Sequence, residues 1–500
     1  MSFLHSELAQ WRAHPLREML AGAVATFALI PEVIAFSFVA GVDPQVGLFA
    51  SFVLSIVIAV FGGRPAMITA AAGSVALVAA PLISAHGLPY LFAAGLLAGV
   101  IQILFGVLRL GVLMRFVSSS VRTGFVNALA ILIFAAQLPQ LHGATSATWA
   151  MLALGLLVIY GLPRLPLPGV RAIPSPLICI VVLSVLAAWL KLDLPTVNDL
   201  GKLPEALPQW MGLPSLPFDL ETLRIIAMPA LAIAMVGLLE SMMTARVVDE
   251  LTDTPSSKNR ECTGLGVANI AASLFGGITG CGMIGQTVGN VKYGGRGRLS
   301  TLFAGVFLLV LMVLLKPWVG QVPVIALVAI MVMVSVSTFD WRSLGALVRH
   351  PRLSGVVMLA TVAVTLGTHN LAAGVGVGVL LSGVFFALKV ARLLRIEQQD
   401  QADGSVRYVV SGQVFFASAD AFIDAFDPRL VQGRAVVIDL SAAQLWDITA
   451  VAALEKVVSR YRHHGIKPRV LGLDRQGRAL LRRVLREGEL AVEDAPATSS

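Results

Sequence analysis

The chain has 500 residues, of which 57% are hydrophobic and only 13% charged. A soluble globular domain carries about twice that share of charge, and apolar stretches of about 20 residues are typical of membrane spans. Residues 1–396 hold 24 Lys and Arg and 15 Asp and Glu, whereas residues 397–500 hold 13 and 14. The sequence therefore predicts a polytopic membrane domain, residues 1–396, followed by a small soluble domain, residues 397–500.

Several classes of protein are disfavoured by composition. The pI near 9.7 reflects an excess of basic residues confined to the apolar part, which fits membrane topology better than nucleic-acid binding. Cys179, Cys262 and Cys281 are far apart and odd in number, so neither a disulfide framework nor a metal site is predicted. The polar start, residues 1–17, lacks the apolar core of a cleaved signal, and we expect it to be retained.

Fourteen membrane segments are predicted from the apolar runs and the Pro, Gly and charged residues between them. With a cytoplasmic N-terminus, loops assigned to the inside hold 20 Lys and Arg and loops assigned to the outside hold four. This bias predicts an inner (plasma) membrane protein with both termini in the cytoplasm. The predicted segments are 17–38, 44–62, 70–84, 89–108, 117–138, 147–162, 172–190, 224–246, 262–277, 282–292, 300–315, 321–338, 353–368 and 371–394.

Segments 3 and 10 are too short to cross a bilayer. They contain 15 and 11 residues, which make helices roughly 22 and 16 Å long, whereas the hydrocarbon core of a bilayer is about 30 Å thick. Each follows a Phe-Gly-Gly phrase, at Phe61–Gly63 and Phe275–Gly277. The offset predicts two inverted seven-segment repeats, about 15–195 and 220–396. A short motif of this kind can also be common in membrane helices without a special role. Paired interrupted segments at matching places in two repeats, however, are typical of a transporter's binding site.

Two half-helices that begin at the same depth would point their N-termini at each other. Free N–H groups and positive dipole ends make such a place attractive to an anion, and small residues let the anion approach the backbone. The residues predicted to line it are Ala72, Gly73 and Ser74 on one side and Cys281, Gly282, Met283 and Ile284 on the other.

Two carboxylates, Glu32 and Glu240, lie deep within predicted segments 1 and 8. A carboxylate inside a membrane is costly and is a functional hypothesis by default. Both are candidates for substrate binding and for coupling to H⁺ or Na⁺, with Glu240 preferred. The alternative is a structural hydrogen bond or a protonated, silent acid. Pro31, directly before Glu32, lacks a backbone N–H and therefore interrupts the hydrogen bonds of the helix, which leaves nearby backbone groups available.

The tail alternates between strand-like and helix-like stretches, which predicts a small α/β unit with a mainly parallel sheet. Asp439 is expected in a turn at a strand end, and Asp447 as a helix N-cap. The predicted strands are 406–418, 435–440 and 467–473, and the predicted helices are 449–462 and 475–486.

The sequence resembles the SulP family of anion transporters, which join a fourteen-segment, uracil-permease-like membrane domain to a cytoplasmic STAS domain. The resemblance covers nearly the whole chain. In the membrane part it is carried by residues 31–36 (PEVIAF), 240–246 (ESMMTAR) and 258–269 (KNRECTGLGVAN), and in the tail by residues 439–441 (DLS) and 446–449 (WDIT).

This resemblance implies a site between segments 3 and 10, lined by segments 1 and 8. Glu32 and Phe36 match the polar and aromatic positions of the first segment, and Glu240 matches the coupling carboxylate. The stretch 281–286 lacks the Arg that many relatives carry there, which weighs against channel-like behaviour. Ile448 stands where bacterial STAS relatives carry a phosphorylatable Ser, which weighs against phosphorylation.

We therefore expect a secondary active transporter of a small anion: a dicarboxylate, sulfate or bicarbonate. H⁺-coupled symport by an elevator-like, alternating-access mechanism is the leading hypothesis, with a homodimer in the lipid bilayer. A passive channel or an exchanger regulated by the STAS domain is the alternative. A nucleobase carrier would have further carboxylates in segment 10, and none occurs there. We expect no catalytic residue, metal, cofactor or nucleic-acid partner.

Overall fold

The computed structural model describes residues 14–111, 117–164, 174–201, 203, 208–217, 219–349, 352–484 and 492–493. The start discussed above, up to residue 13, and the first two residues of predicted segment 7 lie outside these ranges. The chain forms two compact units, Met1–Val379 and Leu380–Ser500. Helix α17 (Leu371–Ala391) contributes its first half to one unit and its second half to the other.

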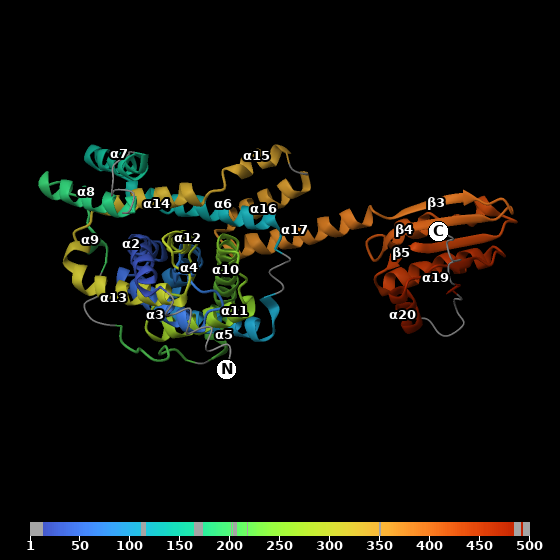
Figure 1. Cartoon of the computed structure of the whole chain (residues 1–500), viewed down its shortest axis with the longest axis horizontal. Helices are drawn as coiled ribbons and strands as arrows, with labels where there is room; N and C mark the ends of the chain where they lie inside the picture. The colour runs from blue at the N-terminus through green and yellow to red at the C-terminus, as the bar shows by residue number, and fades with distance from the viewer. Residues whose placement is uncertain are drawn as a thin grey trace. The chain divides into compact units, whose positions relative to one another are not determined.

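The first unit is almost entirely helical (Figure 1). Within the described residues, nine helices are long and apolar enough to cross a membrane, and three shorter apolar helices accompany them. Besides α17, the helices are α2 (Pro15–Ala40), α3 (Pro44–Phe61), α4 (Gly73–His86), α5 (Leu88–Val107), α6 (Ser119–Ala135), α7 (Ser146–Gly161), α8 (Ser175–Trp189), α9 (Val197–Leu200), α10 (Leu220–Thr252), α11 (Lys258–Leu274), α12 (Ile284–Lys292), α13 (Arg298–Val319), α14 (Val324–Thr338), α15 (Arg342–Arg349) and α16 (Arg352–Thr368).

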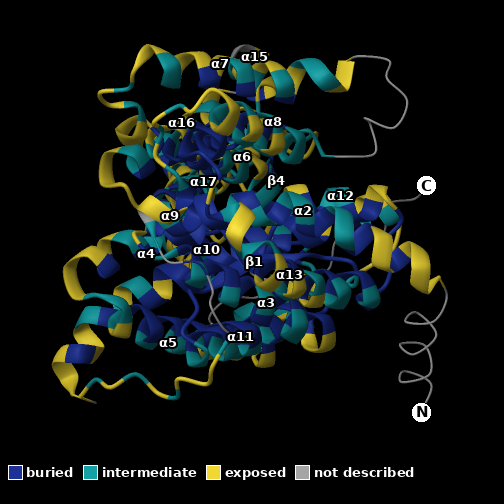
Figure 2. Cartoon of the chain, turned by 90° about the vertical axis from the view of Figure 1, so that its left-hand side faces the viewer, coloured by how far each residue is buried: buried dark blue, intermediate teal, exposed yellow. Residues whose placement is uncertain are grey.

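These helices pack as two bundles, which lie one above the other in Figures 1 and 2. The first bundle consists of α2–α5 and α10–α13, and most of its contacts are internal. The second bundle consists of α6–α8, α14 and α16, with the start of α17 against α16, where Gly374 and Gly378 meet Thr365 and Thr361. The bundles touch where α8 and α14 meet α2 and where α4 meets α6. Both predicted intramembrane acids, on α2 and α10, belong to the first bundle.

Two three-residue strands cross inside the first bundle. Strand β1 (Thr69–Ala71) pairs antiparallel with β2 (Gly280–Gly282), so that Ala70 lies opposite Cys281. Each strand leads into a short helix, α4 with 14 residues and α12 with nine. The strands pair closely because their residues are small. A Cβ at Gly280 would collide with the Ala70 carbonyl oxygen. Segments 3 and 10 are thus short helices preceded by extended chain.

Two buried carboxylates tie the repeats to each other. Glu261 of α11 accepts hydrogen bonds from the backbone N–H groups of Gly63 (2.7 Å) and Arg64 (3.0 Å) in the loop after α3. Glu18 of α2 accepts from the N–H groups of Arg296 (2.6 Å) and Gly297 (2.9 Å) in the loop before α13. In each case the carboxylate of one half of the bundle holds the loop of the other half, which joins the halves into one body.

The second unit is an α/β domain with its own hydrophobic core. Its five-stranded sheet has the order β3-β4-β5-β6-β7, antiparallel between β3 and β4 and parallel elsewhere. The predicted, mainly parallel sheet is therefore present, and β3 and β7 are additional strands. The elements are β3 (Arg395–Asp400), β4 (Val406–Val414), α18 (Ala419–Asp424), β5 (Val436–Leu445), α19 (Ile448–His463), β6 (Arg469–Leu471), α20 (Arg475–Val484) and β7 (Val492–Glu493).

The two aspartates of the tail differ in their outcome. Asp447 is the N-cap of α19 and accepts from the Ala450 N–H at 2.9 Å, as predicted. The prediction for Asp439 was wrong, because β5 continues to Leu445 and Asp439 lies within the strand. Its carboxylate pairs with Arg407 of β4 at 2.5 Å. Burial raises the pKa of Asp439, but hydrogen bonds from Ser441 and Arg407 outweigh burial, and the pKa lies below its ordinary value.

Candidate functional site

The two short helices begin without side-chain caps. Ala72 is the N-cap residue of α4 and Met283 is the N-cap residue of α12, and neither side chain accepts from the first turn. Gly73 and Ser74 open α4, and the partly exposed Ile284 opens α12. N–H groups in an uncapped first turn are available to an anion, and the helix dipole adds to the attraction.

A carboxylate from a third helix lies between the starts of the two short helices. The Oε2 atom of Glu240, on α10, accepts hydrogen bonds from the Ser74 hydroxyl and from the Cys281 thiol, the latter at 3.2 Å. The Ser74 Oγ and Cys281 Sγ atoms are 3.8 Å apart. All three residues are buried. Three predicted site residues, from α4, α10 and β2, therefore meet at one oxygen atom.

Strand β2 is also held by α10. The Gly282 N–H donates to Ser241 Oγ at 2.9 Å, and the Gly282 carbonyl accepts from Thr244 Oγ1 at 2.7 Å. The ladder continues where the Met283 N–H donates to the Ile68 carbonyl at 2.8 Å. These contacts fix the entry to α12 relative to Glu240, because Ser241 directly follows that residue.

Two buried amides complete the hydrogen bonding of β2. Asn269 Oδ1, on α11, accepts from the Gly280 N–H at 2.8 Å, and Asn269 Nδ2 donates to the Gly280 carbonyl at 3.2 Å. The same Nδ2 atom donates to Gln102 Oε1, on α5, at 2.9 Å. A buried backbone group without a partner costs free energy, and these amides supply the partners that so short a strand lacks.

The predicted residues of α2 lie beside the other half of the site. Phe36 packs against the start of α4, where a Cβ at Gly73 would lie 2.5 Å from the Phe36 Cε1 atom. Glu32 is half-buried and has the side-chain amide of Gln286, on α12, as a hydrogen-bond partner. Glu32 therefore contacts α12, whereas Glu240 contacts α4 and β2. Among the residues that the structure describes, Glu32 and Glu240 have different hydrogen-bond partners, so the two carboxylates occupy separate positions along the site.

Sequence reasoning did not single out Gln102, Asn269 or Gln286, each of which contacts site residues or β2. All three are buried polar amides in the membrane unit. That property was the available signal, because a polar side chain is rarely buried in a membrane helix without a partner or a role. Within the described ranges, no group of three or more His, Cys, Asp or Glu residues could hold a metal ion.

Comparison with known families and proteins gives concordant results. The model of the sulfate permease family matches residues 16–154 and 145–361, and the STAS domain model matches residues 395–489. YbaR of Bacillus subtilis, a candidate sulfate transporter by its name, is 48% identical over 476 residues, which cover 95% of this chain and 98% of YbaR. The bicarbonate transporter BicA of a Picosynechococcus species is 26% identical, over 88% of this chain and 80% of BicA.

Solved structures share the fold. SLC26A9 superposes with a TM-score of 0.80 at 16% identity, over 95% of this chain and 88% of that chain. The transmembrane domain of a cyanobacterial BicA superposes with a TM-score of 0.63 at 24% identity, over 74% of this chain and 97% of that chain. The membrane unit thus has the mostly helical fold of these transmembrane domains, and the tail matches the STAS domain model. The chain belongs to the sulfate permease family of multi-pass membrane anion transporters and carries a C-terminal STAS domain.

Proposed function

We propose that this chain is a secondary carrier that moves a small oxyanion together with a proton, and that Glu240 is the proton site. The observation that carries the proposal is the position of the Glu240 carboxylate, whose Oε2 atom accepts from Ser74 and Cys281 at the starts of the two half-helices. This is the place at which helix ends and hydroxyl donors would hold a substrate anion.

The same position implies competition between Glu240 and the substrate. A charged Glu240 occupies the donors that the anion needs and also repels it. A proton on Glu240 removes the negative charge, which lets the anion take over the donors from Ser74 and Cys281. Binding of anion and proton is then linked. Glu32, which has Gln286 as its partner, is a second candidate for the coupling ion, and Na⁺ is the alternative ion.

Sulfate is the first substrate to test, because YbaR, at 48% identity, is named for sulfate. Bicarbonate comes second because BicA transports it by name, and dicarboxylates complete the class. The Glu240 carboxylate accepts hydrogen bonds from a hydroxyl and a thiol. A site that lacks a cationic side chain gains most from a proton when its ligand carries two negative charges, and this favours sulfate with H⁺.

For the transport cycle we propose an elevator, in which the first bundle moves against the second bundle. The first bundle carries the whole site and is tied together by Glu18 and Glu261. We propose that α11 and α12 also cross the membrane with the twelve apolar helices, which makes fourteen segments, α2–α8 and α10–α14 with α16 and α17, in two inverted repeats. We further propose a homodimer in the plasma membrane with both termini in the cytoplasm.

Flux measurements on the purified protein in liposomes test this proposal. A carrier is expected to give saturable uptake of labelled sulfate that rises above equilibrium under an inward proton gradient and is unaffected by a sodium gradient. A linear current without saturation would assign the chain to the channel class. Accumulation driven only by sodium would replace the proton as the coupling ion. Flux that requires sulfate or bicarbonate on the opposite side would identify an exchanger.

A further inference from the structure

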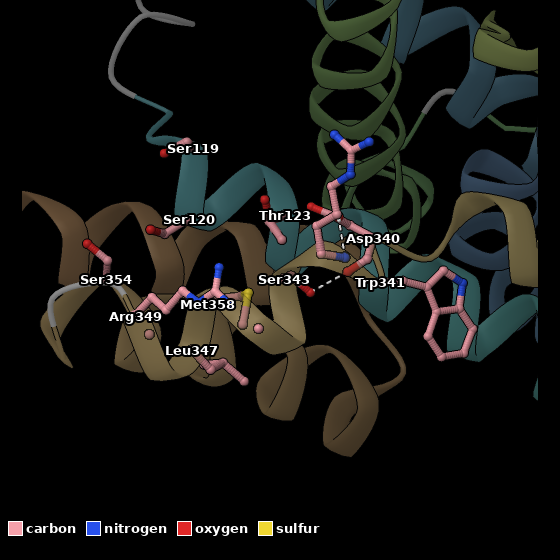
Figure 3. Close-up of a pocket in the computed structure, with 13 residues that line it drawn as sticks. Ser119, Ser120, Thr123, Asp340, Trp341, Ser343, Leu347, Arg349, Ser354 and Met358 are labelled. Carbon is pink, nitrogen blue, oxygen red and sulfur yellow. Dashed lines mark hydrogen bonds between the residues drawn. The ribbon is translucent and has the colours of Figure 1, made fainter.

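We propose that the second bundle carries a binding pocket for the headgroup of an anionic phospholipid, separate from the transport site. The pocket has a volume of about 640 Å³ and lies among the start of α6, the helix α15 and the start of α16 (Figure 3). None of its lining residues belongs to the first bundle. The pocket is large enough for a phosphate and its polar substituent, and nothing in the proposed transport cycle uses it.

The chemistry of the lining fits a phosphate group. Arg349 of α15 lines the pocket together with Ser120 of α6 and Ser354 of α16 (Figure 3), and Arg342 adds a second guanidinium to the lining. Asp340 brings one carboxylate, which accepts from the Arg342 backbone N–H at 3.1 Å. The lining charge is therefore positive by one unit. Arginine beside several hydroxyl donors is the side-chain set that binds phosphate oxygens.

Apolar side chains form part of the same lining. Leu347 of α15 and Met358 of α16 line the pocket together with Trp341. A molecule with an anionic head beside the arginines would place the first apolar part of its chains against these side chains. A soluble phosphate makes no such apolar contact, and this is why we assign the pocket to a lipid.

The surroundings also match the boundary between lipid headgroups and hydrocarbon. Trp341, at the edge of the pocket, is 60% exposed and donates its indole N–H to the Val336 carbonyl at 2.9 Å. Exposed tryptophan is enriched at this boundary. Basic pockets between membrane helices on the cytoplasmic side are suited to anionic headgroups. A bound lipid would hold the second bundle in its leaflet while the first bundle moves.

Native mass spectrometry of the full-length protein, released from bilayer nanodiscs, tests this assignment. The nanodiscs contain phosphatidylcholine and phosphatidylglycerol with the same acyl chains. The wild-type protein is expected to retain phosphatidylglycerol in preference to phosphatidylcholine. Arg349→Gln should weaken this preference about tenfold, the loss expected for one hydrogen bond to a charged group. Arg352→Gln removes the same charge three residues away, outside the lining, and should leave the preference unchanged.

A second variant removes space instead of charge. Gly345 lines the pocket, and a Cβ there meets no atom within 4 Å. Gly345→Leu should therefore fold, keep every charge and still abolish the preference. Equal losses in Arg349→Gln and Arg352→Gln, or full retention in Gly345→Leu, would overturn the proposal. It would also be overturned if glycerol 3-phosphate, added to phosphatidylcholine nanodiscs, stabilised the protein thermally as well as phosphatidylglycerol does, because the pocket would then bind a soluble phosphate.

Discussion

Replacement of Glu240 by Gln separates anion binding from proton coupling. The amide keeps the size of the carboxylate, and its oxygen can still accept from the Ser74 hydroxyl, so we expect the fold to lose about 1 kcal/mol or less. The side chain can no longer change its charge. The variant should therefore bind sulfate at every pH, whereas the wild-type protein should bind it more weakly as the pH rises and Glu240 ionises.

The size of the expected effect follows from the proton gradient. One pH unit is worth about 1.4 kcal/mol per transported proton. With the membrane potential clamped at zero, a gradient of two units can therefore sustain roughly a hundredfold accumulation of an anion that moves with one proton. In Glu240→Gln this ratio should fall to one, while exchange of labelled for unlabelled sulfate continues. Labelled uptake into liposomes with an internal pH indicator measures both quantities.

The matched control is Glu221→Gln, the same substitution at an exposed position in the first turn of α10. It should accumulate sulfate like the wild-type protein. If Glu240→Gln still accumulated sulfate to the wild-type ratio, Glu240 would be a structural acid and Glu32 would be the next residue to test. If the variant lost binding as well as accumulation, the carboxylate would be part of the anion site in its charged form, which is the opposite of the competition proposed above.

Three further predictions concern the scaffold and the tail. Asn269→Ala leaves the backbone N–H and carbonyl groups of Gly280 without their partner, so we expect a loss of about 3 kcal/mol of stability and a loss of sulfate binding. Thermal unfolding with and without sulfate measures both. Unchanged unfolding would show that β2 does not need the amide. Removal of residues 397–500 should reduce flux or yield but leave saturable transport, and complete loss in folded protein would contradict a regulatory tail. Asp439→Asn should destabilise the isolated tail by about 1 kcal/mol at pH 7. Because the pKa of Asp439 is lowered in the folded state, this difference should vanish as the pH falls through that pKa. Urea unfolding followed by Trp446 fluorescence, at pH 7 and at a pH below that pKa, measures the difference. A difference that persists at the lower pH would contradict the prediction.

The sequence predicted the parts of the fold that depend on composition and spacing. The short segments were found because apolar length and glycine punctuation are local properties. The pairing of β1 with β2 was not predicted, because three residues are too few to show the alternation of a strand. Strand β3 was missed for a related reason. Five of its six residues are exposed, and its sequence, RIEQQD, is mostly polar, so that it is typical of a linker.

For the candidate site, likewise, individual residues could be predicted from the sequence but their arrangement in space could not. Ser74, Glu240 and Cys281 could each be proposed from their own segment, but their meeting at one oxygen depends on the crossing of the two halves in space. Glu261 was overlooked because an acidic residue in the first turn of a helix ordinarily interacts with the helix dipole. Its role in holding the loop at Gly63 requires a contact between residues almost 200 positions apart, which no local pattern reveals.

The interlocking of the two halves has a consequence for biosynthesis. When the first half of the chain has entered the bilayer, strand β1 has no partner strand, because β2 begins only at Gly280, 211 residues after Thr69. The loop after α3 likewise lacks the carboxylate of Glu261 until α11 is made. Unpaired backbone groups are costly in a membrane. We therefore expect the nascent first half to remain loosely packed, or to be held by the insertion machinery, until the second half emerges and completes the bundle.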